Sequence, residues 1–168
     1  MSSDSMVTLL GNDGVEVQAT LLAVQQSITL KSMLEVLDED QTNGLPIPLP
    51  EVGGQALRDV IKWCEYHRGE PVDGPISHDN AVNRNPNEWM PTWDFEFLRS
   101  LDKDVLFQVA NASNYLDIPL LLHYTAAMIA LALRGRSTVG MREYLNIEND
   151  MTPEEEERVR QENAWAFE

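Results

Sequence analysis

The chain has 168 residues, 43% of them hydrophobic, so a single domain with one core is expected, with room for a short appendage. Its 28 acidic and 12 basic residues give a formal charge of −16 at pH 7. That charge argues against a nucleic-acid-binding or anionic membrane surface, because both would repel the protein. A basic or apolar partner fits the composition better.

The sequence also bears on the cellular compartment. The first basic residue is Lys31, and no segment before it resembles a signal peptide. The most apolar stretch, which starts at Ile118, is too short to span a membrane. The single cysteine, Cys64, excludes an internal disulfide and suits a reducing compartment. We therefore expect a protein of the cytoplasm and nucleus, with no membrane partner.

The first quarter of the chain predicts a hairpin, a helix and an edge strand. Two β-prone runs flank Asn12-Asp13-Gly14, a turn sequence that favours a hairpin. A helix follows, with Ser27 or Thr29 as its candidate cap. Its apolar residues recur at helical spacing, at Leu30, Met33, Leu34 and Leu37. Residues 45–52 alternate proline with apolar residues, which suits an extended edge strand.

Most of the remaining chain predicts helices. Residues 53–69 have helical spacing and end at Gly69, whereas residues 70–87 are polar, turn-rich and typical of a long loop. Further helices are predicted over residues 92–101, 102–116 and 120–133. A shorter helix is predicted within residues 137–147, where Gly140 weakens it by roughly 1 kcal/mol relative to alanine.

The last predicted helix starts with a strong signal and contains little to bury. Thr152 and Glu155 have the spacing of a capping box around Pro153. Glu154 with Arg158, and Glu156 with Arg160, have the spacing of ion pairs within one helix. Between Pro153 and Glu162 the one apolar side chain is Val159, yet Trp165 and Phe167 follow. Either Trp165 folds back near Leu145 and Ile147, or a partner covers it.

Candidate catalytic and metal-binding residues have simpler structural explanations. Cys64 and His67 lack the further ligands of a zinc site, so we interpret Cys64 as a core residue and His67 as a surface or helix-end residue. A Cys-dependent hydrolase using this pair is the alternative, and it requires an electropositive pocket. The acidic run at residues 38–40 (Asp38, Glu39, Asp40) does not match a calcium loop. No phosphate-binding loop is present, and no cofactor or metal is predicted.

A helix-to-helix junction provides a candidate recognition site. Asn114, Tyr115 and Asp117 precede Pro119, which ends one helix and begins the next. An exposed tyrosine at a rigid corner suits recognition. The alternative is that Tyr115 is a half-buried core residue whose hydroxyl is exposed to water.

Six separated motifs resemble one family in the same order. They are SITLKSMLEVL, PIPLPEV, VIKWCEYH, WDFEFL, LFQVANASNYLDI and LNIENDMTPEEEERVRQENAW. Together they resemble the S-phase kinase-associated protein (Skp) adaptor subunits of SCF ubiquitin ligases, from about residue 6 to residue 166. The resemblance implies an α+β protein and not an enzyme. It would have a BTB/POZ core over residues 6–134 and two C-terminal helices within residues 135–168.

The same resemblance implies two partners and the residues that bind them. A cullin N-terminal region would bind Asn114, Tyr115, Leu116 and Asp117. The F-box of a substrate receptor would bind Phe107, Ile129, Leu133, Leu145, Ile147, Val159, Asn163 and Trp165. The adaptor would bridge the two partners and support ubiquitin-dependent degradation. Self-association through the BTB surface stays open.

Two departures from the family pattern affect these expectations. Residues 136–141 lack the proline and the acidic pair that usually open the penultimate helix, which predicts a less well capped and more adaptable helix. Pro119 and Leu120 replace a basic-glycine pair beside the presumed cullin surface. A rival interpretation is an elongin C-like BTB adaptor for another receptor box. Such chains stop near the apolar helix, so residues 138–166 argue against it.

Overall fold

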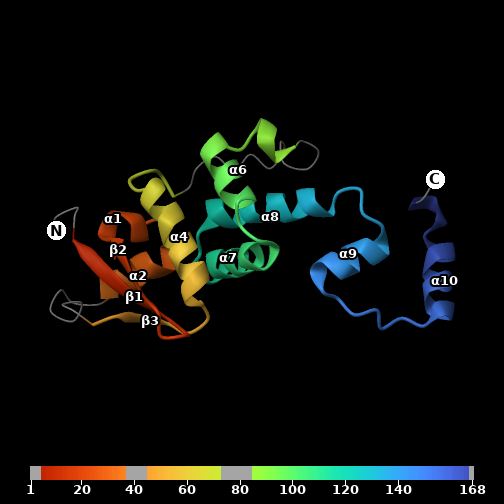
Figure 1. Cartoon of the computed structure of the whole chain (residues 1–168), viewed down its shortest axis with the longest axis horizontal. Coiled ribbons are helices and arrows are strands. Elements are labelled where there is room, and N and C mark those ends of the chain that lie inside the picture. Colours follow the sequence, from red (N-terminus) through yellow and green to blue (C-terminus); the bar gives the residue numbers. More distant parts are fainter. Residues whose placement is uncertain (1–4, 37–44, 73–84, 167–168) are drawn as a thin grey trace. The chain divides into compact units, whose positions relative to one another are not determined.

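The computed structural model describes residues 5–36, 45–72 and 85–166. The chain divides into two compact units, Met1–Ala132 and Leu133–Glu168. Strands and helices are combined in the first unit, and the described part of the second is built from helices (Figure 1). Among these described residues, no helix has both the length and the apolar character needed to cross a membrane.

A small mixed sheet opens the first unit. The predicted hairpin is confirmed, because β1 (Met6–Gly11) pairs antiparallel with β2 (Glu16–Thr20) across a turn in which Gly14 has a φ of 80°. The predicted edge strand is confirmed as β3 (Ile47–Leu49), which pairs parallel with β1. The order β2-β1-β3 leaves the proline-containing strand at an edge, where a missing N–H costs little.

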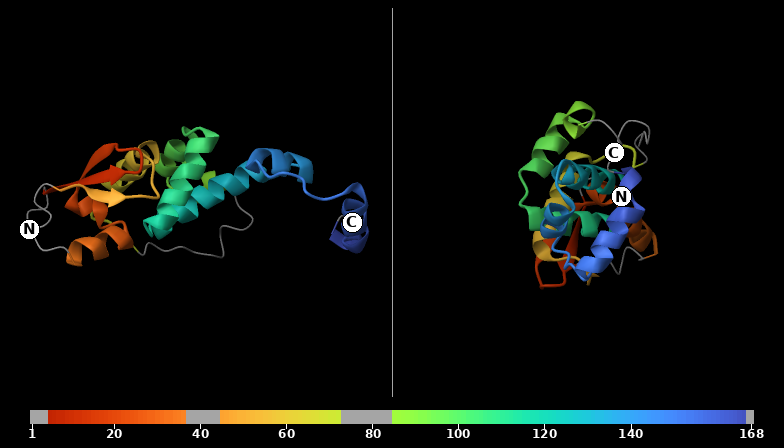
Figure 2. Two further views of the ribbon diagram at one scale, coloured as in Figure 1. Left: turned by 90° about the horizontal axis from the view of Figure 1, so that it is seen from below. Right: turned by 90° about the vertical axis from the view of Figure 1, so that its right-hand side faces the viewer.

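Helices α1 (Leu21–Val24), α2 (Ile28–Val36) and α4 (Gly54–Tyr66) accompany the sheet (Figure 2). The start of α4 lies so close to the hairpin that a Cβ on Gly54 would be 2.4 Å from the Cβ of Val15. Glycine is therefore required there. The backbone N–H of Gly54 also donates to Asp13 Oδ2 (3.0 Å), which joins the hairpin turn to α4.

Three further helices complete the first unit. These are α6 (Thr92–Arg99), α7 (Lys103–Tyr115) and α8 (Pro119–Leu133), whose predicted positions are confirmed. Of the predicted loop, residues 73–84 lie outside the described residues, and Pro86–Glu88 forms the short 3₁₀ helix η1. The largest fully buried side chains include Trp63, Leu57, Leu98, Leu116 and Leu121. They form one apolar core around α4.

The second unit has no comparable interior. It contains α9 (Thr138–Leu145), α10 (Pro153–Glu162) and the 3₁₀ helix η2 (Ala164–Ala166). Across residues 133–165, all of which the structure describes, no residue is buried. Since packing of an apolar face supplies most helix stability in proteins, these helices lack the usual support from a core of their own.

Candidate partner-binding surfaces

The junction between α7 and α8 is a tight, fully bonded corner, defined here as residues 114–117. The backbone N–H of Leu116 donates to Ala112 O (2.9 Å), and that of Ile118 donates to Ser113 O (2.9 Å). Between them Asp117 has a φ of 50°, in the left-handed region that few non-glycine residues adopt. The left-handed residue Asp117 thus separates the end of α7 from Pro119, which begins α8.

The corner residues differ in what they offer to a partner. Asn114 and Asp117 are exposed, and Tyr115 is half-buried against the core. In the free chain Tyr115 is therefore half-buried, as the second of the two interpretations predicts. Leu116 is fully buried, so it anchors the corner and presents no side-chain surface.

In the second unit, α9 is closed at both ends. Ser137 caps its start by accepting the Gly140 N–H at Oγ (3.2 Å), so the departure at residues 136–141 does not leave this helix without an N-terminal cap. At its end Asn146 adopts a left-handed φ of 55°, and the Ile147 N–H donates to Arg142 O (2.9 Å). This closure leaves the Ile147 side chain 55% exposed just beyond the helix.

Helix α10 begins as predicted but is held by an unpredicted contact. The capping box is confirmed, because Thr152 Oγ1 accepts the Glu155 N–H and the Glu155 carboxylate accepts the Thr152 N–H. The Thr152 N–H (2.9 Å) and the Thr152 hydroxyl (3.1 Å) both donate to Glu155 Oε2, and these two hydrogen bonds hold the pKa of Glu155 below its usual value. These bonds fix where the helix starts, but not what it packs against.

A polar clip, defined here as Arg142, Asn149 and Glu156, joins α10 to α9. Glu156 Oε1 accepts from Asn149 Nδ2 (2.8 Å) and from Arg142 Nη1 (3.0 Å). The hydrogen bond from Asn149, followed by that from Arg142, lowers the pKa of Glu156. The expected salt bridge between Glu156 and Arg160 is replaced by this clip, and Arg160 pairs with Glu157 instead (3.0 Å).

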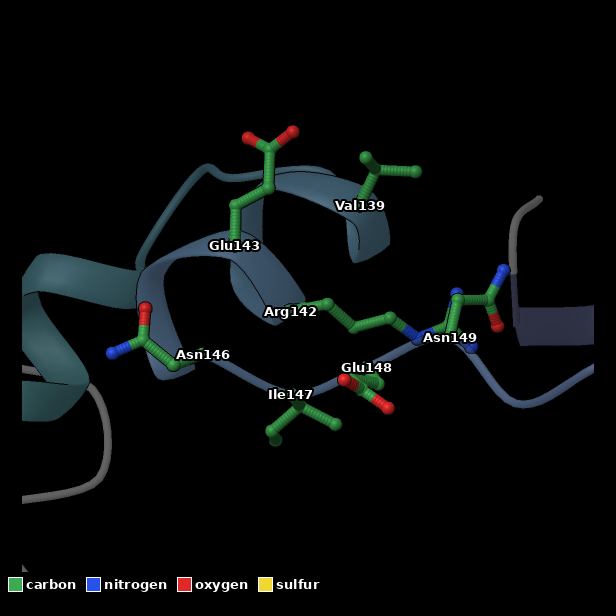
Figure 3. A pocket seen from close by; sticks show the side chains of 7 residues that line it. All are labelled: Val139, Arg142, Glu143, Asn146, Ile147, Glu148 and Asn149. Carbon is green, nitrogen blue, oxygen red and sulfur yellow. The ribbon is translucent and has the colours of Figure 1, made fainter.

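The clip borders a pocket of about 510 Å³ in the second unit. Figure 3 shows the Arg142 side chain extending toward Asn149 along this pocket. Its lining mixes apolar and polar residues, namely Val139, Arg142, Glu143, Asn146, Ile147, Glu148 and Asn149. Two of these seven residues, Val139 and Ile147, are apolar and exposed, and three are charged.

The eight residues expected to bind an F-box fall in both units. Phe107 on α7 and Ile129 on α8 are half-buried in the first unit. The other six lie in the second unit, at Leu133, Leu145, Ile147, Val159, Asn163 and Trp165. None of these six is buried, and Trp165 is 76% exposed. The fold-back alternative for Trp165 is therefore wrong for the free chain, and Phe167 lies outside the described residues.

The Cys64–His67 pair belongs to the core. Cys64 is buried, and desolvation raises the pKa of its thiol, so the core interpretation is confirmed. His67 does end α4, but a surface position is wrong, because only 5% of it is exposed. Its Nε2 lies 2.9 Å from Asp94 Oδ1 and its Nδ1 lies 2.8 Å from Glu70 Oε2.

No candidate metal centre emerges from the described residues, which contain no group of three or more His, Cys, Asp or Glu side chains placed to hold an ion. Asp38, Glu39 and Asp40, the acidic run that does not match a calcium loop, lie outside those residues. His123 lies on α8 beside the rings of Trp89 and Tyr124. Burial raises the pKa of Tyr124 to about 12, so that hydroxyl stays neutral.

Sequence reasoning missed two features of these surfaces. The clip joins residues 14 positions apart on different helices, and no helical spacing rule links such a pair. The hydrogen bonds that fix the corner come from Ser27 and from Thr29 at the start of α2, nearly 90 positions earlier in the chain. Only the candidate cap at Ser27 gave a partial signal.

Comparisons with known proteins cover nearly the whole chain. A model described as "Skp1 family, tetramerisation domain" matches residues 5–69, and one described as "Skp1 family, dimerisation domain" matches residues 119–166. An Arthroderma benhamiae protein, "E3 ubiquitin ligase complex SCF subunit sconC", is 39% identical over 99% of this chain and 98% of its own. "Suppressor of kinetochore protein 1" of Schizosaccharomyces pombe is 38% identical over 96% and 98%. A Caenorhabditis elegans "Skp1-related protein" is 37% identical over 98% and 88%.

Proposed function

This chain belongs to the Skp1 family, and we propose from that membership that it is an adaptor subunit of an SCF ubiquitin ligase. The adaptor would support ubiquitin-dependent protein degradation. The resemblance read from the six motifs is thereby confirmed, as is the α+β, BTB/POZ fold with its small mixed sheet and C-terminal helices. The match over residues 119–166 also favours this family over an elongin C-like adaptor.

The adaptor would act by binding and not by catalysis. The Skp1 family is one of non-catalytic adaptors. The Cys-dependent hydrolase alternative is contradicted by Cys64, which is buried and whose thiol pKa is raised by desolvation. A nucleophilic cysteine needs the opposite environment.

One observation carries the proposal that an F-box partner binds the second unit. Exposed large apolar side chains are concentrated there, at Val139, Met141, Ile147, Met151, Val159 and Trp165. None of residues 133–165 is buried, so these apolar side chains have no core of their own in which to be buried. Covering apolar area contributes about 25 cal/mol per Å² before ordering costs are subtracted. An apolar F-box segment would supply that cover.

The corner on the first unit is the proposed site for the cullin N-terminal region. Asn114 and Asp117 offer polar groups, and Tyr115 offers an aromatic edge on a rigid junction. Rigid aromatic anchors bind at low entropic cost. The two proposed sites share no residue, which bridging two partners requires.

Selective loss of one partner tests this arrangement. In pull-downs, Tyr115→Lys should lose the cullin N-terminal region and keep the F-box segment. Deletion of residues 152–168 should do the reverse. Each variant serves as the folding control for the other. Cullin recovery at the wild-type level with Tyr115→Lys would contradict the assignment of the corner as the cullin site. Unchanged F-box binding after the deletion would contradict the assignment of the second unit as the F-box site.

Two further expectations extend the proposal. We propose that the chain acts in the cytoplasm and nucleus, which microscopy of a tagged chain would test. Self-association through the BTB surface stays a prediction, and light scattering across a concentration series would measure it.

A further inference from the structure

The corner does not hold its shape alone, because the start of α2 is bonded to it. The Ile28 N–H donates to Asp117 O (3.0 Å), and the Thr29 N–H donates to Leu116 O (3.4 Å). Thr29 Oγ1 also donates to Tyr115 O (3.4 Å). Three successive carbonyls of the corner thus accept hydrogen bonds from the first turn of another helix.

Ser27 connects the two helix ends through a single hydroxyl. Its Oγ donates to Leu116 O and accepts the Leu30 N–H (3.0 Å). A serine hydroxyl has one donor and two acceptor positions, so it can make both bonds at once. The residue is fully buried, and water cannot replace either bond.

The bonding satisfies groups that helices leave unpaired. The first N–H groups of α2 and the last carbonyls of α7 have no partner within their own helices. Placing one helix end against the other pairs them without a ligand. The same contact fixes Asp117 in its left-handed conformation, which an unsupported aspartate would leave readily.

We propose that Ser27, with Ile28 and Thr29, is a positioning element for the cullin-binding corner, and that Ser27 is its central residue. The inference rests on the proposed function, in which the corner receives the cullin. None of these three residues needs to touch the partner. They keep Tyr115 and Asp117 in the one arrangement that binds.

The expected effect follows from population arithmetic. If the corner samples other conformations, the apparent affinity falls by the fraction of chains that remain competent. Removing one buried hydroxyl should raise the Kd for the cullin region about fivefold to tenfold, as expected for one lost buried hydrogen bond. The loss should appear without any change in the residues that contact the partner.

Ser27→Ala in the full chain is the principal variant, and Thr125→Val is its matched control. Thr125 is equally buried, but its hydroxyl bonds only to carbonyls of α8, at Leu121 O (2.9 Å) and Leu122 O (3.0 Å). Both variants lose a buried hydroxyl and some thermal stability. Ser27→Thr keeps the hydroxyl and tests rescue.

The readouts separate positioning from general stability. Calorimetric titration with a cullin N-terminal region should show weaker binding for Ser27→Ala and near wild-type binding for Thr125→Val and Ser27→Thr. Hydrogen exchange of the Ile28 and Thr29 amides should accelerate in Ser27→Ala alone. Binding of an F-box segment should stay unchanged in all three.

Two results would overturn the proposal. If Thr125→Val weakens cullin binding as much as Ser27→Ala does, the effect comes from lost stability. If Ser27→Ala binds cullin like the wild type, the corner keeps its conformation without the Ser27 hydroxyl. Tyr115→Lys distinguishes this failure from failure of the proposed function. If Tyr115→Lys loses cullin while Ser27→Ala does not, only the positioning role fails. If Tyr115→Lys binds normally, the corner is not the cullin site and both proposals fall.

Discussion

His67 is held between two carboxylates that come from different parts of the chain. Asp94 Oδ1 also accepts from Trp63 Nε1 (2.6 Å), so Trp63 and His67 both contact one oxygen of a fully buried carboxylate. Desolvation of His67 lowers its pKa, but the hydrogen bonds to Asp94 and Glu70 outweigh it and the net pKa is raised. With both ring nitrogens facing carboxylates, the charged imidazolium donates to both.

This arrangement predicts a pH-dependent stability. Because the folded-state pKa of His67 lies above the ordinary value of 6.5, its contribution is full below pH 6.5 and is lost as pH rises through the folded-state pKa. Urea unfolding across this range should show a falling free energy of unfolding in wild type. His67→Gln should flatten the slope, and His123→Gln should not. An equal slope in wild type and His67→Gln would contradict the network.

Cys64 should resist thiol reagents in the folded protein. It is buried within α4, and desolvation raises its thiol pKa, so few chains carry the reactive thiolate. At pH 8 a maleimide reagent should label the native chain slowly and the urea-unfolded chain fully, as mass spectrometry would report. Rapid native labelling would reopen the hydrolase interpretation.

At the level of elements, the polar clip explains how a helix without an apolar stripe can have a defined position. Arg142→Glu and Glu156→Arg should each weaken F-box binding by about twofold to fivefold, the scale of a partly exposed ion pair. The double variant should partly restore the affinity, because the charges attract again. Calorimetric titration at low salt would measure this cycle. Additive losses in the double variant would contradict the clip.

Helix α9 contains a glycine whose replacement should improve binding. A Cβ on Gly140 would meet Ser137 Oγ at 3.5 Å and Arg136 Cβ at 3.6 Å, which are ordinary contacts. Gly140→Ala should favour the helix by about 0.5–1 kcal/mol and strengthen F-box binding accordingly, because less ordering remains to be done on binding. Gly135→Ala is the control. Its φ of 77° disfavours alanine, so no gain is expected. A loss of affinity in Gly140→Ala would show that α9 must stay adaptable.

Local signals predicted most elements, because turns, caps and apolar spacing act within a few residues. The hairpin at Gly14, the capping box at Thr152 and the start of α8 at Pro119 follow from such rules. Contacts between distant residues could not be predicted in this way. The burial of His67 depends on Asp94, and the corner depends on Ser27, and neither pair has a local signature.

For the whole molecule, the difference between the two units is functional. The first unit has its own core around α4, whereas residues 133–165 bury none of their side chains. An adaptor needs one stable part and one part that a partner completes. We propose that the first unit holds the cullin and that the second is completed by the F-box.

Hydrogen exchange in the second unit tests this claim most directly. The amides of α9 and α10 would be followed in the free chain and with an F-box segment that co-purifies with it. The account predicts fast exchange in the free chain, strong protection on binding, and little change in α4, whose core is already complete. Protection of α9 and α10 in the free chain to the level of α4 would contradict it, because the second unit would then need no partner.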